Sequence, residues 1–148
     1  MRILGLDFGA HTVGVAVSDE LGLTAQGVEI IRRKSPNKLR QTLARINELV
    51  SFYGVDKIIL GYPKNMNNTE GERCEKTKEF QSLLEKRTGI LAELWDERLT
   101  TVAADHIMSE SGIRGMRRRE YVDEIAAMLI LQGYLDFKNM DKESYGKN

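Results

Sequence analysis

The sequence predicts an α/β protein with a mixed five-stranded sheet, in which three antiparallel strands come first and two parallel strands follow, with helices on both faces. Two observations predict this fold class. Short runs rich in branched residues alternate with longer segments whose apolar residues have helical spacing. The links between the first three strand-like runs are too short for a crossover, whereas each of the last two follows a helix-like segment.

The three N-terminal strands are expected at residues 2–7, 12–19 and 25–32. The link FGAHT between the first two is too short for a crossover, so these strands should pair as an antiparallel hairpin. The apolar run KIILGYP at 57–63 predicts a central strand, because a strand covered by helices on both faces is apolar along its length. The run ILAELWDE at 90–97 predicts the fifth strand.

Two helices are expected between these strands. The first should have Ser35 as its N-cap and Pro36 as its first residue, and it should end at Gly54. The second is expected from about residue 70 to residue 87, with a stop near Gly89. Its core-facing residues are expected to be Phe80, Leu83 and Leu84.

Two further helices are expected after the fifth strand. One begins near residues 99–101 and ends at about Ser111, and a glycine- and arginine-rich loop, GIRGMRRRE, follows it. The last helix is expected from about Glu120 to Lys138. We therefore expect one domain over residues 1–138 and a polar, flexible tail over 139–148.

Composition limits the class of protein. Of the 148 residues, 41% are hydrophobic and 30% are charged, as in an ordinary globular domain, and no apolar run approaches the length of a membrane span. The formal net charge is zero, so any binding of nucleic acid must come from local patches. A single cysteine, Cys74, and a strand pattern at the N-terminus in place of a signal peptide predict a cytoplasmic protein.

Acidic residues fall where strands end or where the last helix begins. Asp7 ends the first strand, Asp96 and Glu97 end the fifth, and Asp123 lies in the first turn of the last helix. Functional groups in such sheets gather at the carboxyl ends of the strands. The small alanines at 126–127 would let the helix approach the sheet closely, which could bring Asp123 beside the other carboxylates.

Several carboxylates at one place repel one another, and a divalent cation would remove that repulsion. Mg²⁺ prefers oxygen ligands and is held by a few carboxylates together with phosphate oxygens of a substrate. Each position also has a structural explanation of its own. An Asp at a strand end is a common turn residue, and acidic residues near a helix start complement the helix dipole.

Four stretches, taken together, resemble the signature of the YqgF family. They are LGLDFGAHTVGVAVSD, IILGYPKNMNNTEGE, WDERLTT and VDEIAAMLILQGYL, and they extend the resemblance from Met1 to about Phe137. The resemblance implies a ribonuclease H-like fold and a Holliday-junction-resolvase-like nuclease that processes the 5′ end of pre-16S ribosomal RNA. It also implies that Asp7, Glu97 and Asp123 are the catalytic residues and the ligands of Mg²⁺ or Mn²⁺.

Basic and polar residues provide candidates for binding nucleic acid. The clusters RRK at 32–34 and RGMRRR at 114–119 are the most basic stretches, although runs of charge are often only solvated surface. The guanidinium fork of arginine matches a phosphate group, which makes Arg117, Arg118 and Arg119 the first candidates. Lys64 and Asn65, in the loop KNMNNTEGE, are expected to contact nucleic acid as well.

Three alternatives remain open on the sequence alone. The protein could resolve branched DNA, or it could be a non-catalytic module that binds nucleic acid or ribosomal precursor particles. A nucleotide phosphotransferase is disfavoured, because folds of that kind close two such halves on the nucleotide and this chain supplies one. The sequence does not choose between RNA and DNA, or between a monomer and a homodimer; no membrane partner is expected.

Overall fold

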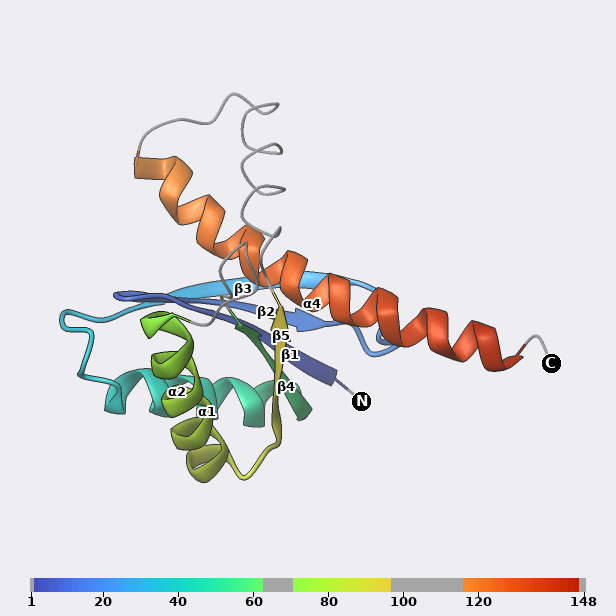
Figure 1. Cartoon of the computed structure of the whole chain (residues 1–148), viewed down its shortest axis with the longest axis horizontal. Helices are drawn as coiled ribbons and strands as arrows, with labels where there is room; N and C mark the ends of the chain where they lie inside the picture. The colour runs from blue at the N-terminus through green and yellow to red at the C-terminus, as the bar shows by residue number, and fades with distance from the viewer. Residues whose placement is uncertain (1, 63–70, 97–115, 147–148) are drawn as a thin grey trace.

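A computed structural model describes residues 2–62, 71–96 and 116–146, with the backbone alone described at 72, 116–124 and 141–146. The elements in chain order are β1 (Arg2–Phe8), β2 (Thr12–Ser18), β3 (Ala25–Arg32), α1 (Arg40–Tyr53), β4 (Val55–Tyr62), α2 (Glu72–Thr88), β5 (Ala92–Asp96) and α4 (Met116–Gly146), as Figure 1 shows. The strand expected at 57–63 begins two residues earlier and the strand expected at 90–97 begins two residues later, while residues 63 and 97 lie outside the described residues. The helix expected at about 99–111 lies outside the described residues.

The five strands form one sheet in the order β3-β2-β1-β4-β5. β1 pairs antiparallel with β2, and β2 pairs antiparallel with β3. β4 is parallel to β1, and β5 is parallel to β4. The predicted mixed sheet is confirmed. Because β1, β4 and β5 run in the same direction, their carboxyl ends share one edge of the sheet.

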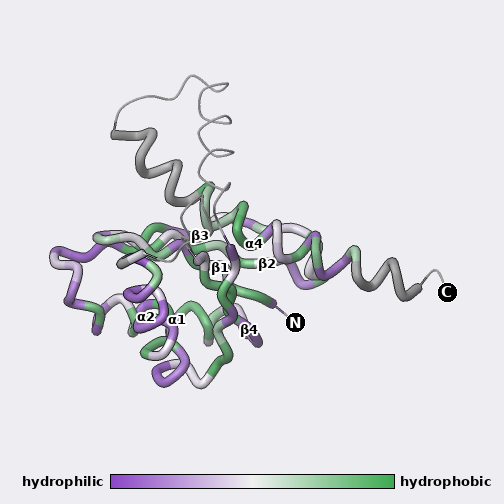
Figure 2. Tube along the Cα trace, in the orientation of Figure 1, coloured by the Kyte–Doolittle hydropathy of each residue, from purple (hydrophilic) through white to green (hydrophobic). Residues whose placement is uncertain are grey.

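Helices cover both faces of the sheet, as predicted. α1 and α2 lie on one face and α4 lies along the other (Figure 1). Side chains of β1 alternate between two separate cores: Leu4 and Leu6 belong to the core beneath α1 and α2, and Ile3 belongs to the core beneath α4. Figure 2 shows hydrophobic colouring along the strands and hydrophilic colouring on the loop between β3 and α1.

α4 approaches β1 at Gly5. A Cβ atom at Gly5 would lie 2.7 Å from the Cβ of Leu131 and 3.3 Å from the carbonyl oxygen of Ala127. Real Cβ atoms do not approach other heavy atoms so closely, so only glycine fits at this position. Ala126 and Ala127 are both buried, as expected for a helix that lies close to the sheet. The predicted close approach of this helix is confirmed.

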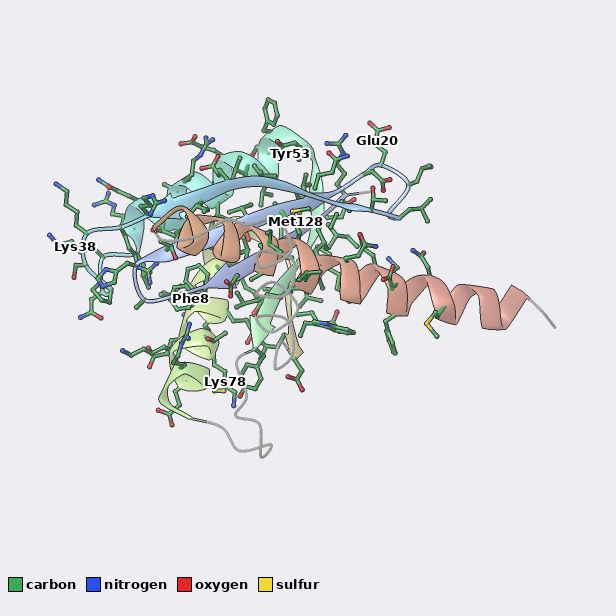
Figure 3. The ribbon with its side chains drawn as sticks, turned by 90° about the horizontal axis from the view of Figure 1, so that it is seen from above. Phe8, Glu20, Lys38, Tyr53, Lys78 and Met128 are labelled. Atoms are coloured by element: carbon green, nitrogen blue, oxygen red, sulfur yellow. The ribbon has the colours of Figure 1, made fainter. Side chains whose placement is uncertain are left out.

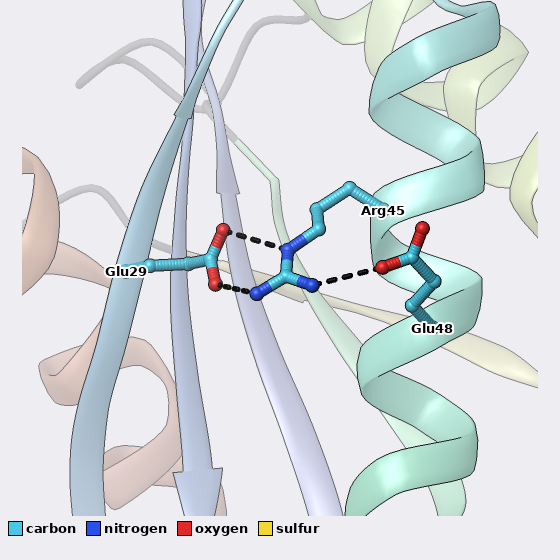
Figure 4. Close-up of polar contacts among 3 residues, drawn as sticks. All are labelled: Glu29, Arg45 and Glu48. Carbon is cyan, nitrogen blue, oxygen red and sulfur yellow. Dashed lines mark hydrogen bonds and ion pairs between the residues drawn. The ribbon is translucent and has the colours of Figure 1, made fainter.

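An arginine joins α1 to the edge strand β3 (Figure 4). The guanidinium of Arg45 donates two hydrogen bonds to the carboxylate of Glu29, at 2.6 and 3.1 Å, and a third to Glu48 at 2.9 Å. These bonds, those to Glu29 first, raise the pKa of Arg45 above its ordinary value. The trio aligns α1 with the sheet from the surface, because Glu29 and Arg45 belong to different elements.

The start of α1 differs from the prediction. The helix begins at Arg40, and neither Ser35 nor any other side chain caps it. Residues 35–38 instead form a turn, in which the backbone N–H of Lys38 donates to the carbonyl of Ser35 at 3.1 Å. Serine at the first position and proline at the second suit a type I turn as well as they suit a helix start. The predicted end is correct, since Gly54 adopts a left-handed conformation with φ of 62°.

α2 ends where predicted, with Gly89 in a left-handed conformation. Phe80 and Leu84 are fully buried, but Leu83 is 41% exposed, so the predicted inward orientation of Leu83 is wrong. Cys74, Thr77, Phe80 and Leu84 form the buried stripe of the helix. At 100° per residue, Leu83 lies outside this stripe.

α4 is longer than predicted at both ends. It begins at Met116, so Arg117, Arg118 and Arg119 lie in the first turn of the helix and not in a loop. It continues past Lys138 to Gly146, and its C-terminal part projects beyond the sheet (Figure 1). The domain boundary expected at Lys138 stays a prediction. Within the described part of the chain, no helix is both long and apolar enough to cross a membrane.

Candidate active site

Asp7 lies near the carboxyl end of β1, on the face of the sheet that α4 covers. Ile3 and Gly5 contact α4, and side chains two residues apart on a strand share a face, so Asp7 also faces that side. Its partner on β2 is Gly14. On the other side, Leu6 pairs with Leu60, which puts Gly61 beside Asp7 in the continuing register. No side chain from either neighbour therefore crowds the half-buried carboxylate.

The direction of α4 relates Asp123 to Asp7. The amino group of Lys57, the β4 partner of Ile3, donates a hydrogen bond of 2.9 Å to the hydroxyl of Tyr134. Ala127 and Leu131, which precede Tyr134, contact β1 at Gly5. α4 therefore runs antiparallel to β1. One turn before Ala127 covers about 6 Å and leads to Asp123, and two residues after Gly5 cover about 6.6 Å and lead to Asp7.

The backbone of Asp123 thus lies toward the same edge of the sheet as Asp7. The side chain of Asp123 and the whole of Glu97 lie outside the described residues. Glu97 directly follows Asp96, which is exposed at the end of β5 and pairs with Tyr62. The convergence of the three carboxylates stays a prediction. Among the side chains that the structure describes, no group of three histidine, cysteine or acidic residues could hold a metal ion.

The candidate nucleic-acid contacts are described in part. The backbone of residues 117–119 lies in the first turn of α4, on the chain segment that leads to Asp123. Their side chains, and the whole of Lys64 and Asn65, lie outside the described residues. Their roles stay predictions.

Two arginines that the sequence did not assign to the site hold the hairpin that follows Asp7. Arg33 Nη2 donates to the carbonyl oxygen of Gly9 at 2.5 Å, and Arg73 Nη2 donates to the carbonyl oxygen of Phe8 at 3.3 Å. The ring of Phe8 stacks on Phe80 of α2 with centroids 4.1 Å apart. Arg33 belongs to the basic stretch at 32–34, so the sequence indicated a possible contact with nucleic acid there. Nothing in the sequence distinguished Arg73 from other exposed helical residues.

A polar group holds α4 to the far end of β4 and β5. The amino group of Lys57 forms an ion pair with Glu93 at 2.6 Å and also donates to Tyr134. Burial acts to lower the pKa of Lys57, but the hydrogen bonds with Glu93 and Tyr134 outweigh it and raise that pKa. Trp95 packs edge-on against Tyr134, with ring centroids 5.7 Å apart. These contacts fix the position of α4 along the strands, and with it the position of residue 123.

The Asp7 environment suits a hard divalent cation. A carboxylate offers the oxygen donors that Mg²⁺ and Mn²⁺ prefer. Its partner on β2 is Gly14, which has no side chain, so the β2 neighbour leaves space beside the carboxylate. One carboxylate is too few for a stable site, so further donors must come from the chain segments that meet this edge.

A family model described as RuvX, Holliday junction resolvase, matches residues 1–137. The chain belongs to the RuvX family. The resemblance to the YqgF family is confirmed, because relatives with high identity are named as pre-16S rRNA nucleases, the activity that the resemblance implies. A relative from Agathobacter rectalis is 74% identical over 137 residues, which cover 93% of this chain and 96% of the relative. A relative from Lachnospira eligens is 54% identical over 138 residues, which cover 93% and 99%. Both are named "Putative pre-16S rRNA nuclease".

Solved structures share the fold of this RuvX chain. The structure of Thermus thermophilus RuvC in complex with a Holliday junction substrate has a TM-score of 0.58 and 12% identity, covering 93% of this chain and 96% of that chain. The fowlpox virus Holliday junction resolvase has a TM-score of 0.50 and 15% identity, covering 96% and 99%. These likenesses confirm the expected ribonuclease H-like fold.

Proposed function

We propose that this protein is a metal-dependent nuclease that hydrolyses phosphodiester bonds in RNA and processes the 5′ end of pre-16S ribosomal RNA. The observation that carries the proposal is the position of Asp7, near the carboxyl end of the central strand β1, beside Gly14 and beneath the helix that bears Asp123. The names and near-complete coverage of the relatives support the choice of substrate. We expect the protein to act in the cytoplasm, on ribosomal precursor particles.

The three acidic residues have a common role in this proposal. Asp7, Glu97 and Asp123 would hold one or two Mg²⁺ or Mn²⁺ ions through their carboxylate oxygens. When bound, such a cation stabilises the charge that develops on the reacting phosphate and promotes ionisation of the attacking water. Asp7 provides the fixed point, because β1 pairs with strands on both sides and cannot shift independently of the sheet.

The remaining steps belong to side chains of the chain itself. Glu97 or Asp123 would orient the attacking water by accepting a hydrogen bond from it. Water adds to phosphorus and releases a proton to solvent, the bond to the leaving oxygen breaks, and that oxygen takes up a proton from solvent. Basic and polar side chains would bind the RNA backbone and align it with the acidic residues. These are Arg117, Arg118 and Arg119, together with Lys64 and Asn65.

Cleavage of branched DNA is the second candidate function. It is favoured by the description of the matching family and by the shared fold with a resolvase solved on a Holliday junction. A resolvase that cuts two strands needs two active sites and hence a dimer, whereas cleavage of a single RNA strand needs one. A non-catalytic role in ribosome assembly is the third possibility, and it requires that the acidic residues be dispensable.

One assay separates these functions. The purified protein and its Asp7→Asn variant are incubated with Mg²⁺ or Mn²⁺ and either an RNA carrying the 5′ extension of 16S RNA or a four-way DNA junction. We expect cleavage of the RNA, lowered at least about 100-fold by Asp7→Asn, because removing one charge-stabilising group from an active site has effects of this size. Cleavage of the junction alone would favour the resolvase. Cleavage that Asp7→Asn leaves unchanged would contradict the assignment of the site.

A further inference from the structure

A small pocket lies just beyond the carboxyl end of β1, on the face of the sheet opposite the one that Asp7 occupies. The hairpin residues Phe8, Gly9 and Ala10 form one wall, the loop between β3 and α1 forms a second, and α2 forms a third. Its volume of about 160 Å³ is several times the roughly 30 Å³ share of one water and below the lower limit of about 300 Å³ for drug-sized ligands. It has room for a group such as phosphate.

Arg33 lines the pocket as a half-buried cation whose hydrogen bonding is incomplete. Its guanidinium lies over the ring of Phe8, 4.9 Å from the centroid, and donates to the carbonyl of Gly9. Its Nη1 atom is buried and has no hydrogen-bond partner in the structure, and Arg33 forms no ion pair with any described residue. Burial lowers its pKa, yet a guanidinium remains charged at neutral pH. A bound anion would offset the charge of this guanidinium, which no ion pair with a described residue neutralises.

Further cations come from α2, on the other side of the pocket. Arg73 and Lys76 line it, three residues apart and therefore on one side of the helix. Both side chains are exposed at the mouth of the pocket. No acidic residue is among the described residues that line the pocket. Cations from two elements distant in sequence therefore surround one small space.

The basic surface continues away from the pocket along the loop between β3 and α1. A second, open hollow of about 590 Å³ shares Arg33 and Asn37 with the pocket. Its other cationic residues are Arg32, Lys34, Lys38 and Arg40. Figure 3 shows Lys38, in this loop, at the same end of the molecule as Phe8. In a chain of zero net charge, such a run of cations creates a strongly positive region by local grouping.

We propose that the pocket between Arg33 and Arg73 binds a backbone phosphate of a nucleic acid. This phosphate would lie close in the strand to the one that is hydrolysed at Asp7. The pocket and Asp7 lie on either side of the same hairpin, because Phe8 and Gly9 directly follow Asp7 and line the pocket. A polyanion explains both the small pocket and the basic surface that leads away from it, whereas a single small anion would use only the pocket. That the polymer is RNA rests on the proposed function, whereas the binding of a phosphate group rests on the residues of the pocket.

Binding measured without divalent cations tests the proposal independently of cleavage. The test variant is Arg73→Gln/Lys76→Gln, and the matched control is Lys86→Gln/Arg87→Gln, which removes one arginine and one lysine from the exposed last turn of the same helix. Fluorescence anisotropy of a labelled RNA in EDTA is recorded over a salt series. We expect about tenfold weaker binding for the test variant and a salt slope lower by about one. The control should bind within about twofold of the parent, because surface charges far from a contact are largely screened.

A second measurement identifies the pocket itself. Titration of the parent with inorganic phosphate should shift the backbone amide NMR signals of Gly9 and Ala10, and the test variant should lose this response. Equal weakening of RNA binding in the test and control variants would overturn the proposal, because the charge would then act non-specifically. Phosphate-dependent shifts with unchanged RNA binding would assign the pocket to a free phosphate and overturn the backbone assignment. A parent that binds RNA through this pocket but cleaves nothing would refute the proposed function and leave this inference intact.

Discussion

Gly5 of β1 and Leu131 of α4 meet so closely that a Cβ atom on Gly5 would lie 2.7 Å from the Cβ of Leu131. This contact sets the distance between α4 and the sheet. The separation between Asp7 on the sheet and Asp123 on the helix therefore depends on it. Asp7 is two residues beyond Gly5 on the strand, and Asp123 is one turn before Ala127, whose carbonyl also faces Gly5. A residue that has no chemical role therefore controls the geometry of the candidate site.

Replacing Gly5 with alanine should force α4 away from β1. We expect Gly5→Ala to lower the free energy of unfolding by about 1–3 kcal/mol, as overpacking of a well-filled core does. Gly133→Ala is the control, because its Cβ would meet only the Trp95 side chain, at 3.3 Å. The control gains up to about 1 kcal/mol of helix propensity and should be near neutral. Urea denaturation measures both, and equal stability of the two variants would contradict the close contact.

Asp123→Asn should separate cleavage from binding. Asparagine keeps the size of aspartate and one oxygen acceptor but removes the charge, so the fold should remain intact and repulsion with Asp7 should fall. We expect single-turnover cleavage to drop by about 100-fold or more, with RNA binding unchanged or slightly tighter. Parent-like cleavage by this variant would exclude Asp123 as a metal ligand.

The triple change of Arg117, Arg118 and Arg119 to alanine should have the opposite effect. These residues lie in the first turn of α4, where alanine is a favourable helix former, so the helix should persist. Binding should weaken across RNA sequences, and the salt slope should decrease by about one for each phosphate that the variant no longer binds. Saturating RNA should restore much of the cleavage rate. An unchanged salt slope would mean that these arginines are ordinary solvated surface.

The Lys57 group predicts a dependence of stability on pH. Its pKa is raised in the folded protein, so the folded state binds that proton more tightly than the unfolded state does. The stabilisation is complete below the unfolded pKa of about 10.4 and is lost as the pH rises through the folded value. At pH 8, Lys57→Met should lower the free energy of unfolding by about 0.5–1.5 kcal/mol. The difference from the parent should shrink by pH 11, and a difference that stays constant over this range would contradict the role of the ion pair.

The sheet could be predicted from the sequence because its signals are local. Short links require antiparallel hairpins, and an apolar run such as KIILGYP requires a strand covered on both faces. Helix boundaries were less predictable where one motif suits two structures. The run from Ser35 to Lys38 matches both a helix start and a turn, and the structure adopts the turn. Leu83 was misplaced because the buried stripe of α2 includes Cys74 and Thr77, which hydrophobicity alone does not reveal.

The candidate site was predictable in part for a similar reason. Asp7 could be placed because it lies near the carboxyl end of a strand that the sequence itself predicts. The contribution of Arg33 and Arg73 to the pocket could not be predicted. The pocket forms only where the hairpin, the loop between β3 and α1, and α2 meet. Neither residue belongs to a local motif that indicates this packing.

Manganese titration followed by NMR tests the central claim, that Asp7 and Asp123 share a divalent cation. Mn²⁺ broadens the amide signals of residues close to it; Gly14 pairs with Asp7, and Gly61 follows Leu60, the partner of Leu6. We predict weak broadening of both signals in the parent, stronger broadening when a non-cleavable RNA analogue is present, and a clear loss of Mn²⁺ affinity in Asp123→Asn. The increase with RNA is expected because a few carboxylates leave most coordination positions to water or phosphate oxygens. Broadening at Gly14 and Gly61 that Asp123→Asn leaves unchanged would contradict the shared site.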